Sequence, residues 1–191
     1  MKKFLNHKLL VSSLLIITTS CNRNASVPDE TKQVYERLHG KYEAISSFSS
    51  EAVDVNLDGT ATNDMLSEIP DLANCNLEIH ITEGNFLLLQ FWPEQYIGHD
   101  IEPAGYDSSL AVNYAKQGVT RTFSLNAANT NIQVNADTTP KPDPVRFPFP
   151  AAVTIEGKDT VKIVFSKKLY TSTGWKTVSI TTTYKRYTMT T

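Results

Sequence analysis

The chain has 191 residues, with 18 basic and 20 acidic side chains and a formal net charge of −2 at pH 7. This weakly acidic balance excludes nucleic acid as an expected partner, because phosphate binding requires a basic surface. The length suits one domain with a sizeable hydrophobic core.

The first twenty residues have the layout of an export signal. They contain three lysines and no acid, followed by an apolar stretch over residues 9–17 and the small residues Thr18, Thr19 and Ser20. The apolar stretch is far shorter than the ~20 residues that a membrane-spanning helix requires. We therefore expect residues 1–20 to be removed, which leaves 15 basic against 20 acidic side chains and a net charge of −5.

The segment Thr18-Thr19-Ser20-Cys21 resembles the lipobox of bacterial lipoproteins. The resemblance implies cleavage after Ser20 and attachment of palmitate-like acyl chains to Cys21, and several such chains anchor a protein stably to a membrane. Residues 21–28 show no periodicity and are expected to form a flexible tether. The residue after Cys21 is Asn22, whereas retention in the inner membrane is associated with aspartate at this position. We therefore expect anchoring in the outer membrane on its periplasmic side, with the cell surface as the alternative.

Residues 29–191 are expected to form the folded domain. The segment Asp29–His39 predicts one short helix, because acids stand at its start, Val34 and Leu38 are four residues apart, and Gly40 provides a stop. Once Cys21 carries lipid, Cys75 has no partner within the mature chain, so core packing must stabilise the fold. A lone thiol of this kind is expected to be a small buried apolar residue.

Residues 54–64 read Asp-Val-Asn-Leu-Asp-Gly-Thr-Ala-Thr-Asn-Asp and resemble the calcium loops of EF-hands and dockerins. Oxygen ligands at positions 1, 3, 5, 7 and 9, with glycine at 6, are what calcium requires of one short loop. The candidate calcium ligands are Asp54, Asn56, Asp58, Thr60, Thr62 and Asp64. No other cofactor is expected.

Two features of this segment leave a metal-free turn open as the alternative. Position 12, where the bidentate acid belongs, is Met65, and Glu68 comes three places later. Asp, Asn and Gly also build turns without a metal. Thr62 or Asn63 is then the expected cap of a short helix that runs to Ile69.

Stretches rich in β-branched and aromatic residues, separated by turn signals, predict strands over the rest of the chain. Leu77, Ile79 and Ile81 alternate with polar residues, as is typical of a half-buried strand. The proline-rich stretch 138–150 predicts an extended loop at the rim. About eight strands are expected, near residues 41–48, 77–82, 86–92, 119–125, 131–134, 151–155, 161–169 and 176–187.

Short links between these stretches, such as Glu83-Gly84-Asn85, favour pairing between neighbours in sequence. Eight strands are enough to close a barrel and so remove exposed edges. The predicted fold is therefore all-β: an antiparallel up-and-down barrel of about eight strands, with a short N-terminal helix and a short helix after the first strand. A curled sandwich is the alternative.

The mature chain contains no recognised catalytic signature. Its histidines, His39, His80 and His99, lack zinc spacing, and there is neither a Gly-x-Ser-x-Gly elbow nor a phosphate loop. We therefore expect a protein that is not an enzyme and name no catalytic residue.

Gly40-Lys41-Tyr42, after a short helix, resembles the Gly-x-Trp start of lipocalins. That resemblance implies a barrel in which an arginine near the end, here Arg186, packs over the Tyr42 ring. Together with residues 53–59 and 64–69, the segment is similar to lipocalin-like lipoproteins of Bacteroidetes. The resemblance implies a β-barrel with a pocket.

The leading hypothesis is a lipid-anchored envelope binding module for an apolar or amphipathic small molecule. The alternative is a structural or accessory lipoprotein that docks onto an envelope protein complex and has no such ligand. A lumen larger than ~300 Å³ favours the first, and a packed lumen favours the second. The aromatic residues expected to line a pocket are Phe86, Phe91, Trp92, Phe123, Phe165 and Trp175.

Overall fold

Strands make up most of the chain beyond Gly40. The structure is a computed structural model that describes residues 29–98, 103–135 and 148–191. The predicted signal, Cys21, the tether and most of the proline-rich stretch lie outside the described residues. In chain order the elements are α1 (Asp29–Leu38), β1 (Gly40–Val53), β2 (Thr62–Asp64), α2 (Met65–Glu68), the 3-10 helix η1 (Leu72–Asn74), β3 (Leu77–Thr82), β4 (Asn85–Ile97), β5 (Val112–Leu125), β6 (Ile132–Val134), β7 (Ala152–Glu156), β8 (Thr160–Thr171) and β9 (Gly174–Thr188).

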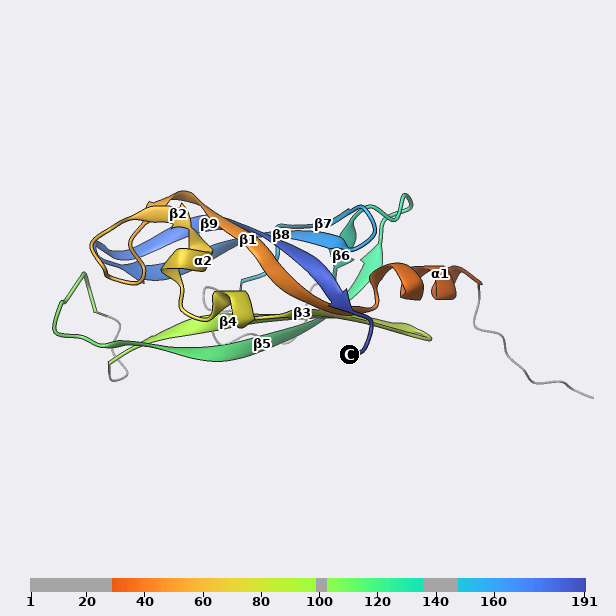
Figure 1. The fold of residues 1–191 in the computed structure, drawn as a ribbon, viewed down its shortest axis with the longest axis horizontal. Helices are drawn as coiled ribbons and strands as arrows, with labels where there is room; N and C mark the ends of the chain where they lie inside the picture. The colour runs from red at the N-terminus through yellow and green to blue at the C-terminus, as the bar shows by residue number, and fades with distance from the viewer. Residues whose placement is uncertain (1–28, 99–102, 136–147) are drawn as a thin grey trace, which may run out of the picture.

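The strands form an antiparallel sheet that curls into a nearly closed barrel (Figure 1). The order of its eight main strands is β6-β5-β4-β3-β1-β9-β8-β7, and the short β2 pairs with β1 beside this path. The two end strands meet at the Asn131–Thr154 bridge, where the Ile155 N–H donates to the Thr130 carbonyl at 2.8 Å. The predicted eight-stranded antiparallel barrel is confirmed, with α1 before it and α2 after β2.

Alternation of apolar and polar residues sorts the side chains between the core and the outside. Leu77, Ile79 and Ile81 of β3 are buried, as predicted, and β8 repeats the pattern from Val161 to Leu169. Cys75 belongs to the same core, and burial raises the pKa of its thiol. The interpretation of Cys75 as a small buried apolar residue is therefore confirmed.

Three strands are longer than their sequence patterns indicate. β5 starts at Val112 instead of residue 119, and β4 continues past Pro93 to Ile97. The two strands pair over eleven residues, from Leu87 with Thr122 to Ile97 with Val112. Pairing extends β5 into a polar stretch where the hydrophobic period is weak, so tertiary contacts override the local pattern. β1 likewise reaches Val53.

The N-cap of α2 differs from the prediction. Asp64, rather than Thr62 or Asn63, precedes the helix, and its Oδ1 accepts the Leu66 N–H at 3.0 Å. Thr62 instead accepts the Asp64 N–H on its hydroxyl at 2.9 Å. Within the described ranges, no helix combines the length and apolar character needed to cross a bilayer.

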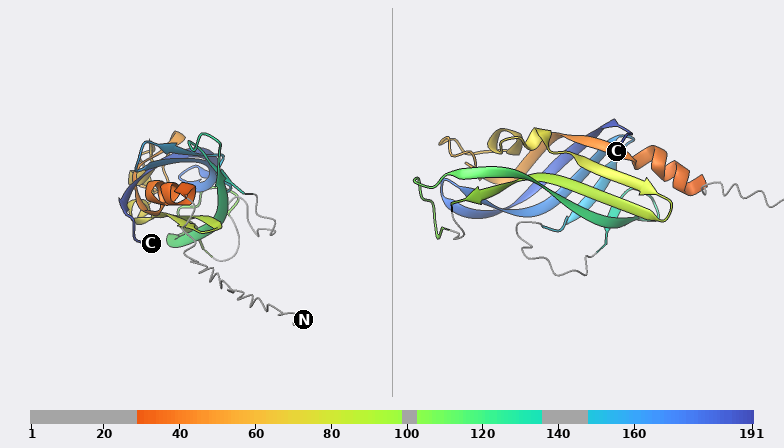
Figure 2. Two further views of the ribbon diagram at one scale, coloured as in Figure 1. Left: turned by 90° about the vertical axis from the view of Figure 1, so that its right-hand side faces the viewer. Right: turned by 90° about the horizontal axis from the view of Figure 1, so that it is seen from below.

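Helix α1 lies across one end of the barrel (Figure 2). The Tyr42 hydroxyl donates to the Leu38 carbonyl at 2.7 Å, and Arg186 Nη1 donates to the carbonyls of Glu36 and His39, each at 3.1 Å. Tyr42 and Arg186 are paired residues of β1 and β9. The two residues that the lipocalin resemblance singles out therefore do lie together at the end of the barrel.

A seam runs along one side of the barrel between β5 and β8. β5 pairs with β6 only at residues 123–125, and β8 pairs with β7 only at residues 160–164. In the described part of the chain, no ladder joins residues 112–121 to residues 165–171. Within the described residues, side-chain packing therefore takes the place of a hydrogen-bonded ladder along this side of the barrel.

Candidate functional site

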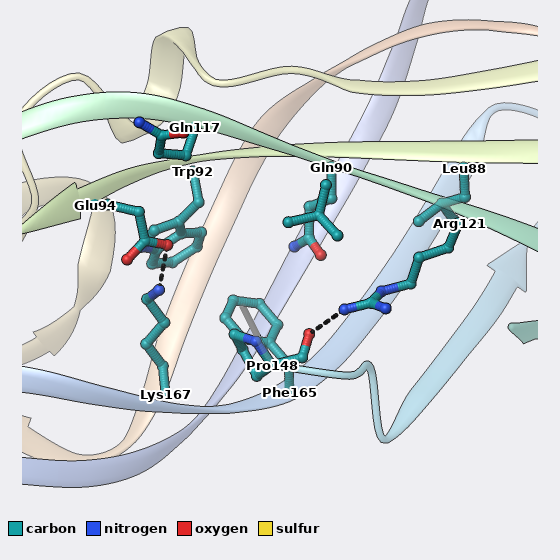
Figure 3. A pocket seen from close by; sticks show the side chains of 10 residues that line it. Leu88, Gln90, Trp92, Glu94, Gln117, Arg121, Pro148, Phe165 and Lys167 are labelled. Atoms are coloured by element: carbon teal, nitrogen blue, oxygen red, sulfur yellow. Dashed lines mark hydrogen bonds and ion pairs between the residues drawn. The ribbon is translucent and has the colours of Figure 1, made fainter. Parts of the chain in front are cut away.

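A pocket lies inside the barrel at this seam, between β4 and β5 on one side and β8 on the other (Figure 3). Its residues come from the inward-facing positions of these strands, and Pro148 stands at its edge. We call it the seam pocket. Its lining residues are Leu88, Gln90, Trp92, Glu94, Gln117, Val119, Arg121, Pro148, Phe165 and Lys167.

Trp92 and Phe165 form the apolar wall of the seam pocket. Their ring centroids are 5.0 Å apart and the rings meet edge to face, at 85°. This is a favourable geometry for an aromatic pair. Both side chains are buried, and Leu88 continues the apolar wall along β4.

Glu94 and Lys167 form a buried ion pair across the lumen (Figure 3). Lys167 Nζ donates to Glu94 Oε1, and their side chains are 3% and 6% exposed respectively. The ammonium also lies 5.9 Å from the Trp92 ring centroid. Two opposite charges are thus held at the aromatic wall, where water has little access.

Arg121 brings a further buried cation to the seam pocket from β5. Its Nη2 donates to the Pro148 carbonyl at 3.3 Å, and its guanidinium carbon lies 4.8 Å from the Phe149 ring centroid. Arg121 is 5% exposed, whereas Phe149 is 44% exposed. Residues 148 and 149 therefore cover Arg121 from outside.

The seam pocket contains a buried donor, the indole N–H of Trp92. Trp92 Nε1 has no hydrogen-bond partner among the described residues. A buried indole N–H normally finds an acceptor. The free space of the seam pocket is about 20 Å³, which is room for about one water molecule.

Sequence and structure comparisons find no match for this chain. Neither a family model, nor a curated protein, nor a solved structure is similar to it. The nearly closed antiparallel barrel is consistent with a lipocalin-like fold.

The six aromatic residues expected at a pocket separate into four places. Trp92 and Phe165 meet in the seam pocket, whereas Phe86 and Phe123 contact each other elsewhere, with centroids 5.5 Å apart. Phe91 packs on the outer face over Gly118 and below Lys116. Trp175 packs against Tyr170, and Lys168 lies over its ring.

The charged residues of the seam pocket were missed by sequence reasoning. A signal for one of them exists: Lys167 is in phase with the buried Phe165 and Leu169 of β8. Glu94 is likewise in phase with Trp92. A charged residue at an inward position of a strand is buried, which is rare unless the charge has a partner. Such a residue therefore indicates a site more strongly than an aromatic residue whose orientation is not known.

Two larger recesses lie outside the seam pocket. One of about 640 Å³ separates α1 from Phe86 and from the β5–β6 connection at residues 125–129. The other, of about 480 Å³, lies beside Lys158 and Arg186. The second recess is lined by the ion-paired Arg186, whose side chain is 5% exposed, but neither recess contains an ion pair that is buried on both sides, as Glu94–Lys167 is in the seam pocket.

The predicted calcium loop is folded as a chain of turns. Asn56 Oδ1 accepts the Asp58 N–H at 3.0 Å, and Asp58 Oδ1 accepts the Thr60 N–H at 2.8 Å. No group of three or more His, Cys, Asp or Glu side chains that could hold a metal occurs in the described part of the chain. Thr62 and Asp64 instead form the hydrogen bonds at the N-terminus of α2 described above.

Proposed function

We propose that the protein is a lipid-anchored binding module for a small amphipathic molecule, which it binds at the seam pocket without chemical conversion. The polar group of the ligand lies near Arg121 and the Glu94–Lys167 pair. The apolar part lies along Trp92 and Phe165. The barrel fold is compatible with binding of this kind.

The buried ion pair is the observation that supports this proposal. Moving two charges out of water is costly, and well-packed apolar residues of similar volume are often equally or more stabilising. A barrel whose lumen only has to be filled therefore gains little from Glu94 and Lys167. Polar groups fixed at an apolar wall are instead what a specific ligand site requires.

The Trp92 indole narrows the chemistry of the ligand. Its buried N–H requires an acceptor, and Arg121 and Lys167 supply further donors. An oxygen-rich polar group, such as a carboxylate or phosphate, offers the Trp92 N–H an acceptor and carries a charge that suits the nearby cations. The free space of about 20 Å³ is far below the ~300 Å³ that favours a ligand-filled lumen. Binding of a molecule larger than water therefore requires Pro148 and Phe149 to move away from Arg121.

The export signal and the lipobox-like segment support the anchoring part of the proposal. Acyl chains on Cys21 place the domain at the outer membrane, facing the periplasm, where amphipathic molecules are abundant. The full chain, expressed in a bacterium with its signal intact, should fractionate with membranes. The Cys21→Ser variant should be released from them.

Extraction of the native ligand tests the binding proposal. The full-length protein is purified in mild detergent, extracted with organic solvent and analysed by mass spectrometry. A double variant, Glu94→Leu with Lys167→Met, carries the same lipid anchor and serves as the matched control. We expect a stoichiometric molecule from the wild-type protein that the double variant lacks. Equal extracts from both folded proteins, or none, would contradict binding at the seam pocket.

The small free volume favours a second candidate function, an accessory lipoprotein that docks onto an envelope protein complex. In that case the lumen is structural. Chemical crosslinking in intact cells should then capture the same protein partner with wild-type chain and double variant. Loss of that partner in the double variant would contradict a docking role that is independent of the lumen.

A further inference from the structure

Residues 54–68, which comprise the turns after β1, the short β2 and α2, have a buried base and an exposed rim. Asp54, Val55 and Glu68 are buried, whereas Asn56 and Asp58 are exposed. We call this segment the Asp54–Glu68 loop. It lies away from the seam pocket and takes no part in the proposed binding there.

The side chain of Glu68 closes the loop by accepting hydrogen bonds from backbone N–H groups of the loop. Its Oε2 accepts the N–H of Val55 at 2.7 Å, and its Oε1 accepts the N–H of Thr62 at 3.1 Å. One carboxylate thereby joins the two sides of the loop. Glu68, which the sequence places too late for an ordinary calcium loop, thus takes a bridging position.

Asp54 has one oxygen that the loop uses and one that it does not. Its Oδ2 accepts the Gly59 N–H at 3.1 Å, so the carboxylate faces across the loop. The whole residue is only 3% exposed, and its Oδ1 is fully buried. This oxygen has no hydrogen-bond partner among the described residues. A buried anionic oxygen without a partner is costly, and such an atom indicates a bound water or ion.

The surroundings of this oxygen favour a hard cation. Asp54, Asn56 and Asp58 carry carboxylate and amide oxygens within one five-residue turn, and Thr60 adds a backbone carbonyl. In the structure, Asn56 Nδ2 donates to Asp58 Oδ2 at 3.1 Å, so calcium would replace this contact. Oxygen ligands of this kind on a flexible loop suit calcium, whereas magnesium demands a nearly ideal octahedron. We infer that the Asp54–Glu68 loop binds one calcium ion at Asp54 Oδ1, with Asn56 and Asp58 as further ligands.

The ligand set has a limited charge. Asp54 and Asp58 are its two carboxylates, and no group of three or more His, Cys, Asp or Glu side chains that could hold a metal occurs in the described ranges. Affinity rises with the number of charged ligands. The calcium affinity therefore belongs to the weak class of extracellular modules, with a Kd of about 0.1–1 mM.

Asp64 provides a matched control. Its Oδ1 caps α2, so the inference assigns it to the helix and not to the metal. The variants Asp58→Asn and Asp64→Asn each remove one negative charge from the loop. The first removes it from a proposed calcium ligand, and the second removes it from the N-cap of α2. Asp54→Asn removes the anchoring carboxylate itself.

Calorimetric titration of the full chain with calcium, to about 10 mM, tests the inference, and a thermal unfolding scan accompanies it. We expect binding heat and a higher Tm with the wild-type protein and with Asp64→Asn. Asp58→Asn should weaken binding at least about tenfold, and Asp54→Asn should abolish it. Should Asp54→Asn fail to fold, Asp58→Asn still decides the matter.

Three results would overturn the inference. The first is the absence of heat and of any Tm shift with folded wild-type protein, which leaves Asp54 Oδ1 to a water molecule. The second is equal weakening by Asp58→Asn and Asp64→Asn, which indicates general charge attraction. The third is equal affinity for magnesium, which contradicts a calcium site.

Discussion

Gln95 pairs with the backbone of Tyr170 as a neighbouring strand would. Its Oε1 accepts the Tyr170 N–H at 2.9 Å, and its Nε2 donates to the Tyr170 carbonyl at 3.0 Å. Tyr170 lies on the part of β8 that borders the seam. One side chain of β4 therefore satisfies strand-edge groups that would otherwise be buried without partners.

Replacement of Gln95 by methionine should destabilise the protein. The change keeps the shape of the side chain but leaves the Tyr170 N–H and carbonyl unpaired, at a cost of about 2–4 kcal/mol. Urea unfolding measures the loss. The control, Gln133→Met on the exposed face of β6, should change stability by less than about 0.5 kcal/mol. A loss equally small at residue 95 would show that water reaches this edge.

The Glu94–Lys167 pair should behave as a coupled unit. Lys167→Met removes the ammonium that pairs with the buried Glu94 carboxylate and should cost about 3–5 kcal/mol. Adding Glu94→Leu should recover at least half of that loss, because apolar residues then fill the same space. A double-mutant cycle by chemical denaturation measures the coupling. Additive losses would contradict the desolvation argument on which the proposed ligand site rests.

Gly40 should tolerate no side chain. Its φ is +144°, and a Cβ there would lie 2.3 Å from the Thr188 carbonyl oxygen and 2.9 Å from Arg186 Cδ. Gly40→Ala should therefore lower the free energy of unfolding by more than about 2 kcal/mol. Gly84→Ala is the control: its φ of +83° is also positive but the space is open, so about 1 kcal/mol is expected. Similar losses at both positions would rule out the steric cause.

Acid should weaken the attachment of α1 through His39. Burial, followed by the charges of His80 and Arg186, lowers the pKa of His39 below 6.5. Its Nδ1 accepts the Ile81 N–H at 3.0 Å, which only an unprotonated nitrogen can do. As the pH falls, the imidazole of His39 therefore becomes protonated at a higher pH in the unfolded chain than in the folded protein. The contribution of neutral His39 to the free energy of unfolding is complete above about pH 6.5 and falls as the pH drops toward the lowered pKa.

Urea unfolding at several pH values between about 5 and 7.5 measures this dependence. His39→Asn retains an acceptor near the Ile81 N–H but does not titrate, so its stability should depend less on pH than that of the wild-type protein. An unchanged slope in this variant would assign the acid sensitivity to other groups.

The fold was predictable because its strands alternate strongly. Leu77, Ile79 and Ile81 carry a clear period of two, and short turns such as Glu83–Gly84 link neighbouring strands. The first half of β5 was not predictable from its own residues, because its ladder with β4 sets its length. Local pattern thus determines the strands, and pairing determines where they end.

The candidate site was predictable only in its apolar part. Trp92 and Phe165 were expected at a pocket and do meet there, whereas the approach of Glu94 to Lys167 depends on the curvature that brings β4 opposite β8. These residues are 73 positions apart in sequence. No local spacing encodes such a contact, although the inward phase of each charge was visible.

The pairing of β1 with β9 has a consequence for biogenesis. Tyr42 of β1 finds its partner Arg186 only when β9 has been made, since these two strands pair in the barrel. Contacts between such distant segments slow folding. The polypeptide therefore spends an interval with its barrel unclosed and its strand edges unprotected, when chaperones are most needed.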